Sequence, residues 1–159
     1  AGANGVVGPA GLARSFDHRV VALDARGTAG GLQRYNVGTD LFSASFPHDA
    51  WFEPSVDGTG AHIALGTTVF DAALNVLSRG ESPALGRGLF VSALSYDGTS
   101  LLHTMYPYGL LRDSVANGQL VERTRLPFYV PYLLRVSSDG KTVIAYDSQY
   151  SRIAVIDLQ

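Results

Sequence analysis

A short pattern, Ser-x-Asp-Gly, occurs three times in this chain, and its spacing limits the folds that the chain can adopt. The copies stand at residues 55–58, 95–98 and 137–140. The last copy separates two β-rich apolar runs, residues 132–136 and 142–146. Asp-Gly between such runs favours a tight hairpin, because glycine adopts positive φ without a Cβ clash. The regular spacing, a period of about 40 residues, predicts a repeat architecture with one supersecondary unit in each repeat.

An apolar strand that closes on aspartate forms a second repeated feature. It ends at Asp24, at Asp71, more weakly at Asp113, and at Asp157. The last three aspartates follow their Asp-Gly turns at similar intervals along the chain. Four short strands fit each period, so we expect an all-β fold, a partial β-propeller built of four-stranded antiparallel blades.

This register divides the single region 1–159 into about three and a half blades. Two complete blades are expected at residues 50–80 and 88–125. Their strands are predicted at 52–56, 61–66, 68–72 and 75–78, then at 89–95, 100–105, 110–113 and 119–124.

The two ends of the chain are expected to hold incomplete blades. The blade at 130–159 has predicted strands at 132–137, 142–146 and 153–158 and lacks its fourth. In the blade at 1–40 the first strand is absent, and residues 6–13, 20–24 and 33–37 are its second, third and fourth strands.

Residues 69–78 leave an alternative open, because four apolar side chains from Phe70 to Leu77 recur at helical spacing. The repeat register and the flanking Gly66 and Gly80 favour two short strands instead.

Composition supports a packed domain and excludes several classes of protein. The 46% hydrophobic and 16% charged residues argue against disorder, and 18 glycines and 7 prolines suit a turn-rich all-β chain. A net charge of −2 gives no indication of nucleic-acid binding, and no apolar run approaches the ~18 residues of a membrane span. Without cysteine, disulfides and thiolate metal sites are excluded. The start lacks both an initiator Met and a signal-peptide pattern, so we expect a trimmed or processed chain, or a piece of a longer one.

The turns and strand ends resemble the YVTN-type β-propeller repeat, a bacterial family related to surface-layer and lactonase-like propellers. The similarity is closest over residues 132–159, where Ser137, Asp139, Gly140 and Asp157 fall in the family's positions. The earlier repeats match it mainly at their turns. The resemblance implies an extracellular or periplasmic propeller of about seven blades. It carries little functional specificity, because propellers host both binding proteins and enzymes.

Ligands are expected at the loops that join the fourth strand of one blade to the next blade, and at those between second and third strands. These loops combine aromatic rings with a few polar groups, which suits a sugar, a peptide or an extended partner. The candidate ligand-binding residues are His48, Asp49, Trp51, Arg87, Tyr106, Tyr108, Tyr129 and Tyr150. The alternative is that these rings pack between blades and cover loop backbone.

No constellation for acid–base or metal chemistry stands out. His48 and Asp49 are adjacent and point to opposite sides of an extended chain, and His18, His62 and His103 lack ligand spacing. The serines and aspartates of the three turns are candidates for turn capping. We therefore expect no catalytic residue, no cofactor and no histidine-dependent metal.

These features favour a non-enzymatic binding or scaffold module that presents loops to a protein or glycan. The alternative is a fragment or subunit of a propeller enzyme, such as a lactonase-like hydrolase or a quinone-dependent dehydrogenase. Open blade edges leave backbone groups unpaired, so the expected partners are the remaining blades, from the same polypeptide or a second chain. A ring of seven blades has no two-fold axis along its channel, so we expect completion by non-identical sequence.

Overall fold

The computed structural model describes residues 11–25, 31–47, 53–80, 91–105, 109–125, 133–137, 141–147 and 151–157. Fifteen strands in these ranges form four antiparallel sheets, so the predicted all-β fold is confirmed. The two strands expected in place of a helix are also confirmed, as β7 (Thr68–Asp71) and β8 (Val76–Arg79). Within the described residues, no helix long and apolar enough to cross a membrane occurs.

Each sheet is a meander whose strands pair in chain order. The first contains β1 (Gly11–Arg14), β2 (Val20–Ala25), β3 (Gly31–Asn36) and β4 (Leu41–Phe46). The second contains β5 (Pro54–Val56), β6 (His62–Leu65), β7 and β8. The third contains β9 (Ser92–Leu94), β10 (Ser100–Met105), β11 (Gly109–Ala116) and β12 (Gln119–Arg125). The fourth has three described strands, β13 (Leu133–Val136), β14 (Thr142–Asp147) and β15 (Arg152–Asp157).

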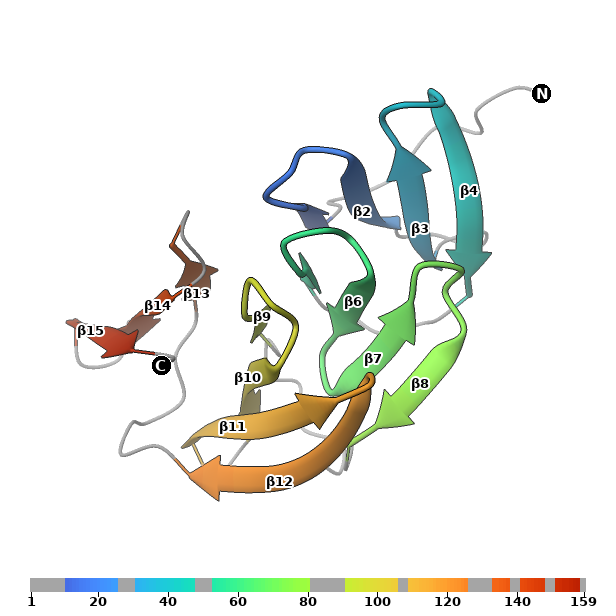
Figure 1. Ribbon diagram of the computed structural model, residues 1–159. Helices are drawn as coiled ribbons and strands as arrows, with labels where there is room; N and C mark the ends of the chain where they lie inside the picture. The colour runs from blue at the N-terminus through green and yellow to red at the C-terminus, as the bar shows by residue number, and fades with distance from the viewer. Residues whose placement is uncertain are drawn as a thin grey trace.

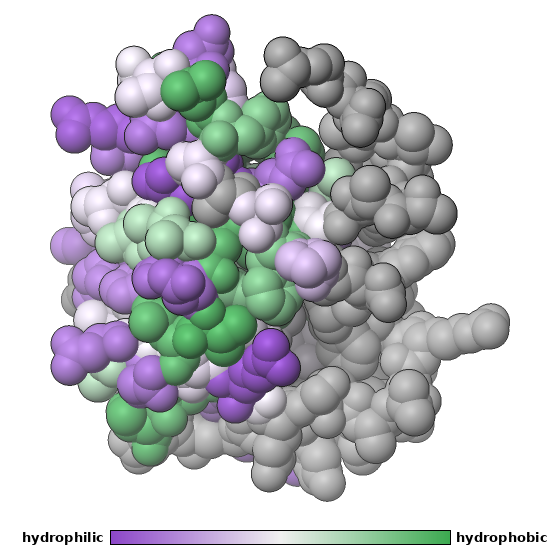
Figure 2. All heavy atoms as spheres, turned by 90° about the vertical axis from the view of Figure 1, so that its right-hand side faces the viewer, coloured by the Kyte–Doolittle hydropathy of each residue, from purple (hydrophilic) through white to green (hydrophobic). Residues whose placement is uncertain are grey.

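The sheets follow one another along an arc, as the blades of a propeller do (Figure 1). The first strands β1, β5, β9 and β13 are neighbours in turn on its inner side, and β4, β8 and β12 lie outermost. The side that carries β4 and β8 is a mosaic of hydrophobic and hydrophilic residues (Figure 2). The arc therefore has an inner rim of first strands and an outer rim of fourth strands.

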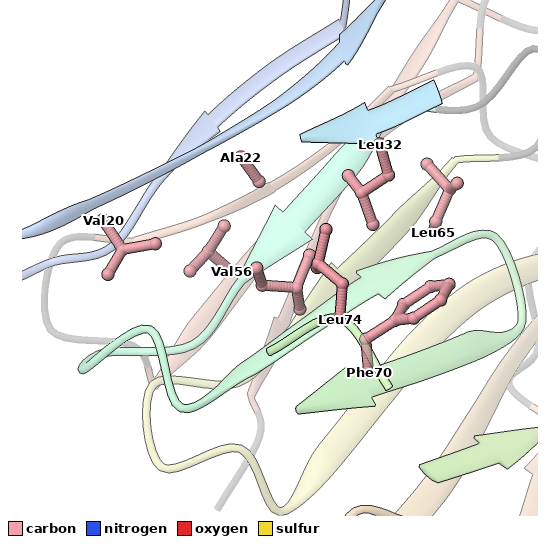
Figure 3. Packing of buried hydrophobic residues seen from close by; sticks show 8 residues of the cluster. Val20, Ala22, Leu32, Val56, Leu65, Phe70 and Leu74 are labelled. Carbon is pink, nitrogen blue, oxygen red and sulfur yellow. The ribbon is translucent and has the colours of Figure 1, made fainter. Parts of the chain in front are cut away.

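Side chains that alternate along the strands fill the space between neighbouring blades. Between the first and second blades, Ala22 and Leu32 pack against Val56 and Phe70 (Figure 3). Phe46 adds an edge contact to Phe70, with ring centroids 4.9 Å apart. Fully burying one such large side chain stabilises the fold by about 1.5–3 kcal/mol, so the blade interfaces are the core of this molecule.

The next two interfaces are built in the same way. The second and third strands of one blade meet the first and second strands of the following blade. The residues are Ala64, Val69, Leu94 and Leu101 at one interface, and Leu102, Leu110, Leu134 and Val143 at the other.

The first blade differs from the prediction, because it contains four strands rather than three. Residues 20–24 belong to its second strand, residues 33–37 overlap its third, and β4 was not predicted. The error came from matching Asp24 to the aspartates that end third strands. Asp24 lies instead in a second strand, opposite Leu32 of the third.

Candidate functional site

The structure brings polar side chains together at one end of the blades, where each first strand turns into the second. We call this end the turn face and define it by the hairpins 15–20, 57–62 and 95–100. In each hairpin the N–H of the first residue donates to the carbonyl oxygen five residues later, at 2.9, 3.1 and 2.9 Å. The fourth blade has the same bond, from Ser137 to Thr142 at 2.8 Å, although residues 138–140 lie outside the described residues.

Serine caps the hairpin in three of the four blades. The Ser95 hydroxyl accepts the N–H of Ser100 at 2.9 Å and donates to Asp97 at 2.7 Å. Asp97 in turn accepts the N–H of Thr99 at 3.0 Å. Ser137 accepts the N–H of Thr142 at 3.0 Å. The capping role predicted for the serines is thus confirmed at Ser95 and Ser137.

The first blade contains a further copy of this turn, which the sequence analysis missed. Ser15 accepts the N–H of Val20 at 3.0 Å and donates to Asp17 at 2.6 Å. His18 stands where the motif has glycine and adopts a φ of 64°, close to the 72° of Gly98. The available signal was the pair Ser15 and Asp17, which repeats the pair Ser95 and Asp97 at a distance of about two periods.

The second turn is shifted by two residues from its predicted register. Asp57, and not Ser55, takes the place of the capping serine, and positive φ falls on Gly60 at 75°. Ser55 instead accepts the N–H of Leu94 in the next blade at 2.6 Å. Asp57-Gly58 and Asp97-Gly98 therefore both lie in hairpins between first and second strands, as predicted, but two residues apart in register within them. Residues 139–140 lie outside the described residues.

One carboxylate, that of Asp57, closes the second turn alone. Its Oδ1 accepts the N–H groups of Thr59, Gly60 and Ala61 at 3.1, 2.6 and 3.0 Å. Its Oδ2 accepts the N–H of His62 at 2.9 Å and lies 2.9 Å from the Nδ1 atom of the same residue. Asp57 is buried and His62 is partly exposed. The carboxylate therefore fixes both the turn and the orientation of the imidazole.

Neighbouring turns are bonded directly to each other. Gly58 accepts the N–H of Asp17 at 3.1 Å and donates its own N–H to Tyr96 at 2.7 Å. The rings of Phe16 and Tyr96 meet edge to face, with centroids 5.3 Å apart. A Cβ at Gly58 would lie 2.6 Å from the Tyr96 carbonyl oxygen, so only glycine permits this approach. The turn face is thus one connected hydrogen-bonded surface.

The carboxylates of the serine-capped turns are held in their charged form. The Ser15 hydroxyl and the Arg19 N–H lower the pKa of Asp17 below its ordinary value. Partial burial raises the pKa of Asp97, but hydrogen bonds from Thr99 and Ser95 outweigh it and leave that pKa lowered. Both side chains therefore act as acceptors at neutral pH.

A second Asp–His pair lies inside the third blade. The Nε2 atom of His103 is 3.0 Å from Oδ2 of Asp113, and both side chains are buried. Ser92 stands opposite His103 in the pairing of β9 with β10 and is buried too. This burial within the blade array suits a role in specifying how the blades pack. Sequence spacing missed the pair because Asp113 approaches His103 only through the pairing of β10 with β11.

None of the predicted ligand-binding residues can be placed. His48, Asp49, Trp51, Arg87, Tyr106, Tyr108, Tyr129 and Tyr150 all lie outside the described residues. Within the described part of the chain, no three His, Asp or Glu side chains gather where they could hold a metal ion.

Comparisons with known proteins show the fold of the chain. No family model and no curated protein matches the sequence. Kuenenia stuttgartiensis hydrazine synthase matches with a TM-score of 0.64 and 15% identity, over 92% of this chain and 45% of that one. Dihydro-heme d1 dehydrogenase NirN in complex with DHE matches with a TM-score of 0.64 and 18% identity, over 93% and 34%. TolB from Acinetobacter baumannii matches with a TM-score of 0.60 and 15% identity, over 94% and 43%.

These structures are β-propellers, and the likeness shows that this chain folds as part of one. The chain spans less than half the length of each of them.

Proposed function

We propose that this chain is part of a β-propeller that acts as a non-enzymatic binding or scaffold module, presenting loops to a protein or a glycan. The observation that supports this most directly is the use of the carboxylate of Asp57. It accepts hydrogen bonds from four backbone N–H groups and orients the His62 ring, so its role is to stabilise the turn. His103 and Asp113 are likewise buried between strands. Both Asp–His pairs of the described residues therefore stabilise the structure within a single blade.

The ligand surface in this proposal is the end of the blades opposite the turn face. The turn face is already engaged in bonds between neighbouring turns, such as those of Gly58 with Asp17 and Tyr96. The residues proposed to bind the ligand there are the aromatic candidates Trp51, Tyr106, Tyr108, Tyr129 and Tyr150, with His48, Asp49 and Arg87 as polar groups. Rigid scaffolds that display variable loops are a common arrangement in binding proteins.

The proposal includes the partners and the location of the protein. The remaining blades come from the same polypeptide or a second chain, and the complete propeller is a bacterial, extracellular or periplasmic protein of the YVTN-type repeat family. The resemblance of residues 132–159 to that repeat supports this assignment.

A binding screen with matched variants tests the function. The purified chain is applied to a glycan array and to a peptide library, alongside Trp51→Ala, Tyr106→Ala and Tyr129→Ala. Tyr96→Ala is the control, because Tyr96 is an exposed tyrosine on the opposite end. We expect a ligand whose affinity falls at least tenfold in the loop variants and is unchanged in the control, a loss of about 1.4 kcal/mol.

Two results contradict the proposal. Equal losses for Tyr96→Ala and the loop variants would place the ligand elsewhere. Turnover of lactones, or of alcohols in the presence of a quinone, would support the alternative of a propeller-enzyme fragment, either a lactonase-like hydrolase or a quinone-dependent dehydrogenase.

A further inference from the structure

Two polar atoms inside the third blade have no hydrogen-bond partner from the protein. They are Oγ of Ser92 on β9 and Nδ1 of His103 on β10. Both residues are buried, with exposed fractions of 5% for Ser92 and 1% for His103. Buried polar groups in native proteins are almost always hydrogen-bonded, either to the protein or to ordered water. These two atoms therefore point to a hydrogen-bonding group that the chain itself does not supply.

Strand pairing places the two side chains next to each other. Ser92 and His103 stand directly opposite one another in the pairing of β9 with β10. The neighbouring pair, Val91 and Thr104, is a hydrogen-bonded pair, because the N–H of Thr104 donates to the Val91 carbonyl oxygen at 3.2 Å. Hydrogen-bonded and non-hydrogen-bonded pairs alternate along an antiparallel ladder, and side chains lie closer together in the second kind. Ser92 and His103 form such a close pair, so one small molecule can contact both.

The other nitrogen of the His103 ring defines what that molecule must do. The Nε2 atom lies 3.0 Å from Oδ2 of Asp113. An ionised carboxylate only accepts hydrogen bonds, so Nε2 carries the hydrogen, and Nδ1 of the neutral ring is an acceptor. The hydroxyl of Ser92 can both donate and accept. The bound molecule must therefore donate to Nδ1 and can bond to the hydroxyl in either direction.

We propose that one buried water molecule bridges Oγ of Ser92 and Nδ1 of His103. It completes a chain of hydrogen bonds from Asp113 on β11 through His103 on β10 to Ser92 on β9. The two side-chain atoms give the water the minimum of two polar partners that a buried water needs. A metal ion fits the site less well, because no three His, Asp or Glu side chains gather there among the described residues.

This water site lies on the side of the third blade that faces the second. Leu94 and Leu101 are two residues from Ser92 and His103 along their strands, and therefore on the same face of the sheet. Leu94 and Leu101 pack against Ala64 of the second blade. A fully bonded polar network at this interface favours one arrangement of its strands over others. The inference goes beyond the proposed function, since it holds whether the complete propeller binds a ligand or catalyses a reaction.

A high-resolution crystal structure of the purified protein tests the inference directly. We expect one ordered water within about 2.7–3.2 Å of both Oγ of Ser92 and Nδ1 of His103. A direct hydrogen bond between these two atoms, an ion in place of the water, or no bound molecule at all would overturn the inference.

Matched variants test it in solution, where oxygen-17 relaxation dispersion of water counts the long-lived internal water molecules. Ser92→Val replaces the hydroxyl by methyl groups and should hold one water fewer than the native protein. Thr104→Val is the control, because Thr104 is also buried on β10 but its hydroxyl bonds directly to the N–H of Val91 at 3.3 Å. The number of waters should be unchanged in this control.

Far-UV circular dichroism checks that both variants remain folded. An unchanged number of waters in Ser92→Val, or an equal loss in the Thr104→Val control, would contradict the assignment of the water to Ser92 and His103. If Ser92→Val does not fold, the crystal structure of the native protein decides the question alone.

Discussion

The turn of the second blade and the turn of the third have the same backbone geometry but different chemistry. In the third, Ser95 accepts the first N–H of the second strand and Asp97 accepts the N–H of Thr99. In the second, Oδ2 of Asp57 takes the role of the serine and Oδ1 takes that of the aspartate. The feature that repeats from blade to blade is therefore the set of hydrogen bonds that closes each turn, and not the Ser-x-Asp-Gly sequence itself.

Among the variants of these turns, removal of the Asp57 carboxylate should lower the free energy of unfolding the most. Asp57→Ala leaves four N–H groups of a mostly buried turn without their acceptor, and an unmade buried hydrogen bond costs about 1–3 kcal/mol. Because water reaches part of the turn, we expect a loss of about 3–5 kcal/mol in the free energy of unfolding. Urea unfolding measures it. Asp57→Asn retains one acceptor oxygen and should lose less, so equal losses for both variants would contradict the assignment of two roles to two oxygens.

Ser95→Ala should lower the free energy of unfolding by less than Asp57→Ala, because it removes only one of the two side chains that cap the third turn. The N–H of Ser100 loses its acceptor and Asp97 loses one donor, for an expected loss of about 1–2 kcal/mol by urea unfolding. Ser55→Ala is the informative companion, since Ser55 bonds to Leu94 in the next blade and caps no turn. If Ser55 capped the second turn, positive φ would fall on Gly58, and Gly58→Ala would be the variant strained by that φ. The structure instead gives Gly60 the positive φ, so that strain should appear in Gly60→Ala.

The serine-capped turns should also respond to acid. The pKa values of Asp17 and Asp97 are lowered in the folded protein, so each side chain contributes stability above its unfolded pKa near 3.8. That contribution is lost as the pH falls through the lower folded pKa. Unfolding followed between pH 5 and pH 2 should therefore show a shallower decline for Asp97→Asn than for the native chain. An unchanged slope would show that Asp97 is not held in its charged form.

The smallest expected effect comes from the histidine in the first turn. His18 adopts positive φ, which disfavours any residue with a Cβ. His18→Gly restores the residue found at this position in the third turn and should stabilise the protein by up to about 1 kcal/mol. Thermal unfolding measures the change, and Gly98→His is the reciprocal variant that should destabilise. A destabilised His18→Gly chain would indicate that the imidazole makes a contact worth more than the strain.

Local signals were enough to establish the fold class. The Asp-Gly turns, their regular period and the alternating apolar runs predicted an all-β propeller, and the strands at residues 68–71 and 76–79 followed from the register. These features depend on backbone preferences within a few residues, which the sequence records directly. The eight loop residues chosen for ligand binding stay predictions, since they lie outside the described residues.

Only the tertiary structure decided the register of the second turn, the number of strands in the first blade and the contacts between blades. Asp57 could replace a serine because its two oxygens reach N–H groups that the folded hairpin brings together. Leu110 is buried because Leu134 and Val143 of the fourth blade pack against it, a contact between residues far apart in the chain.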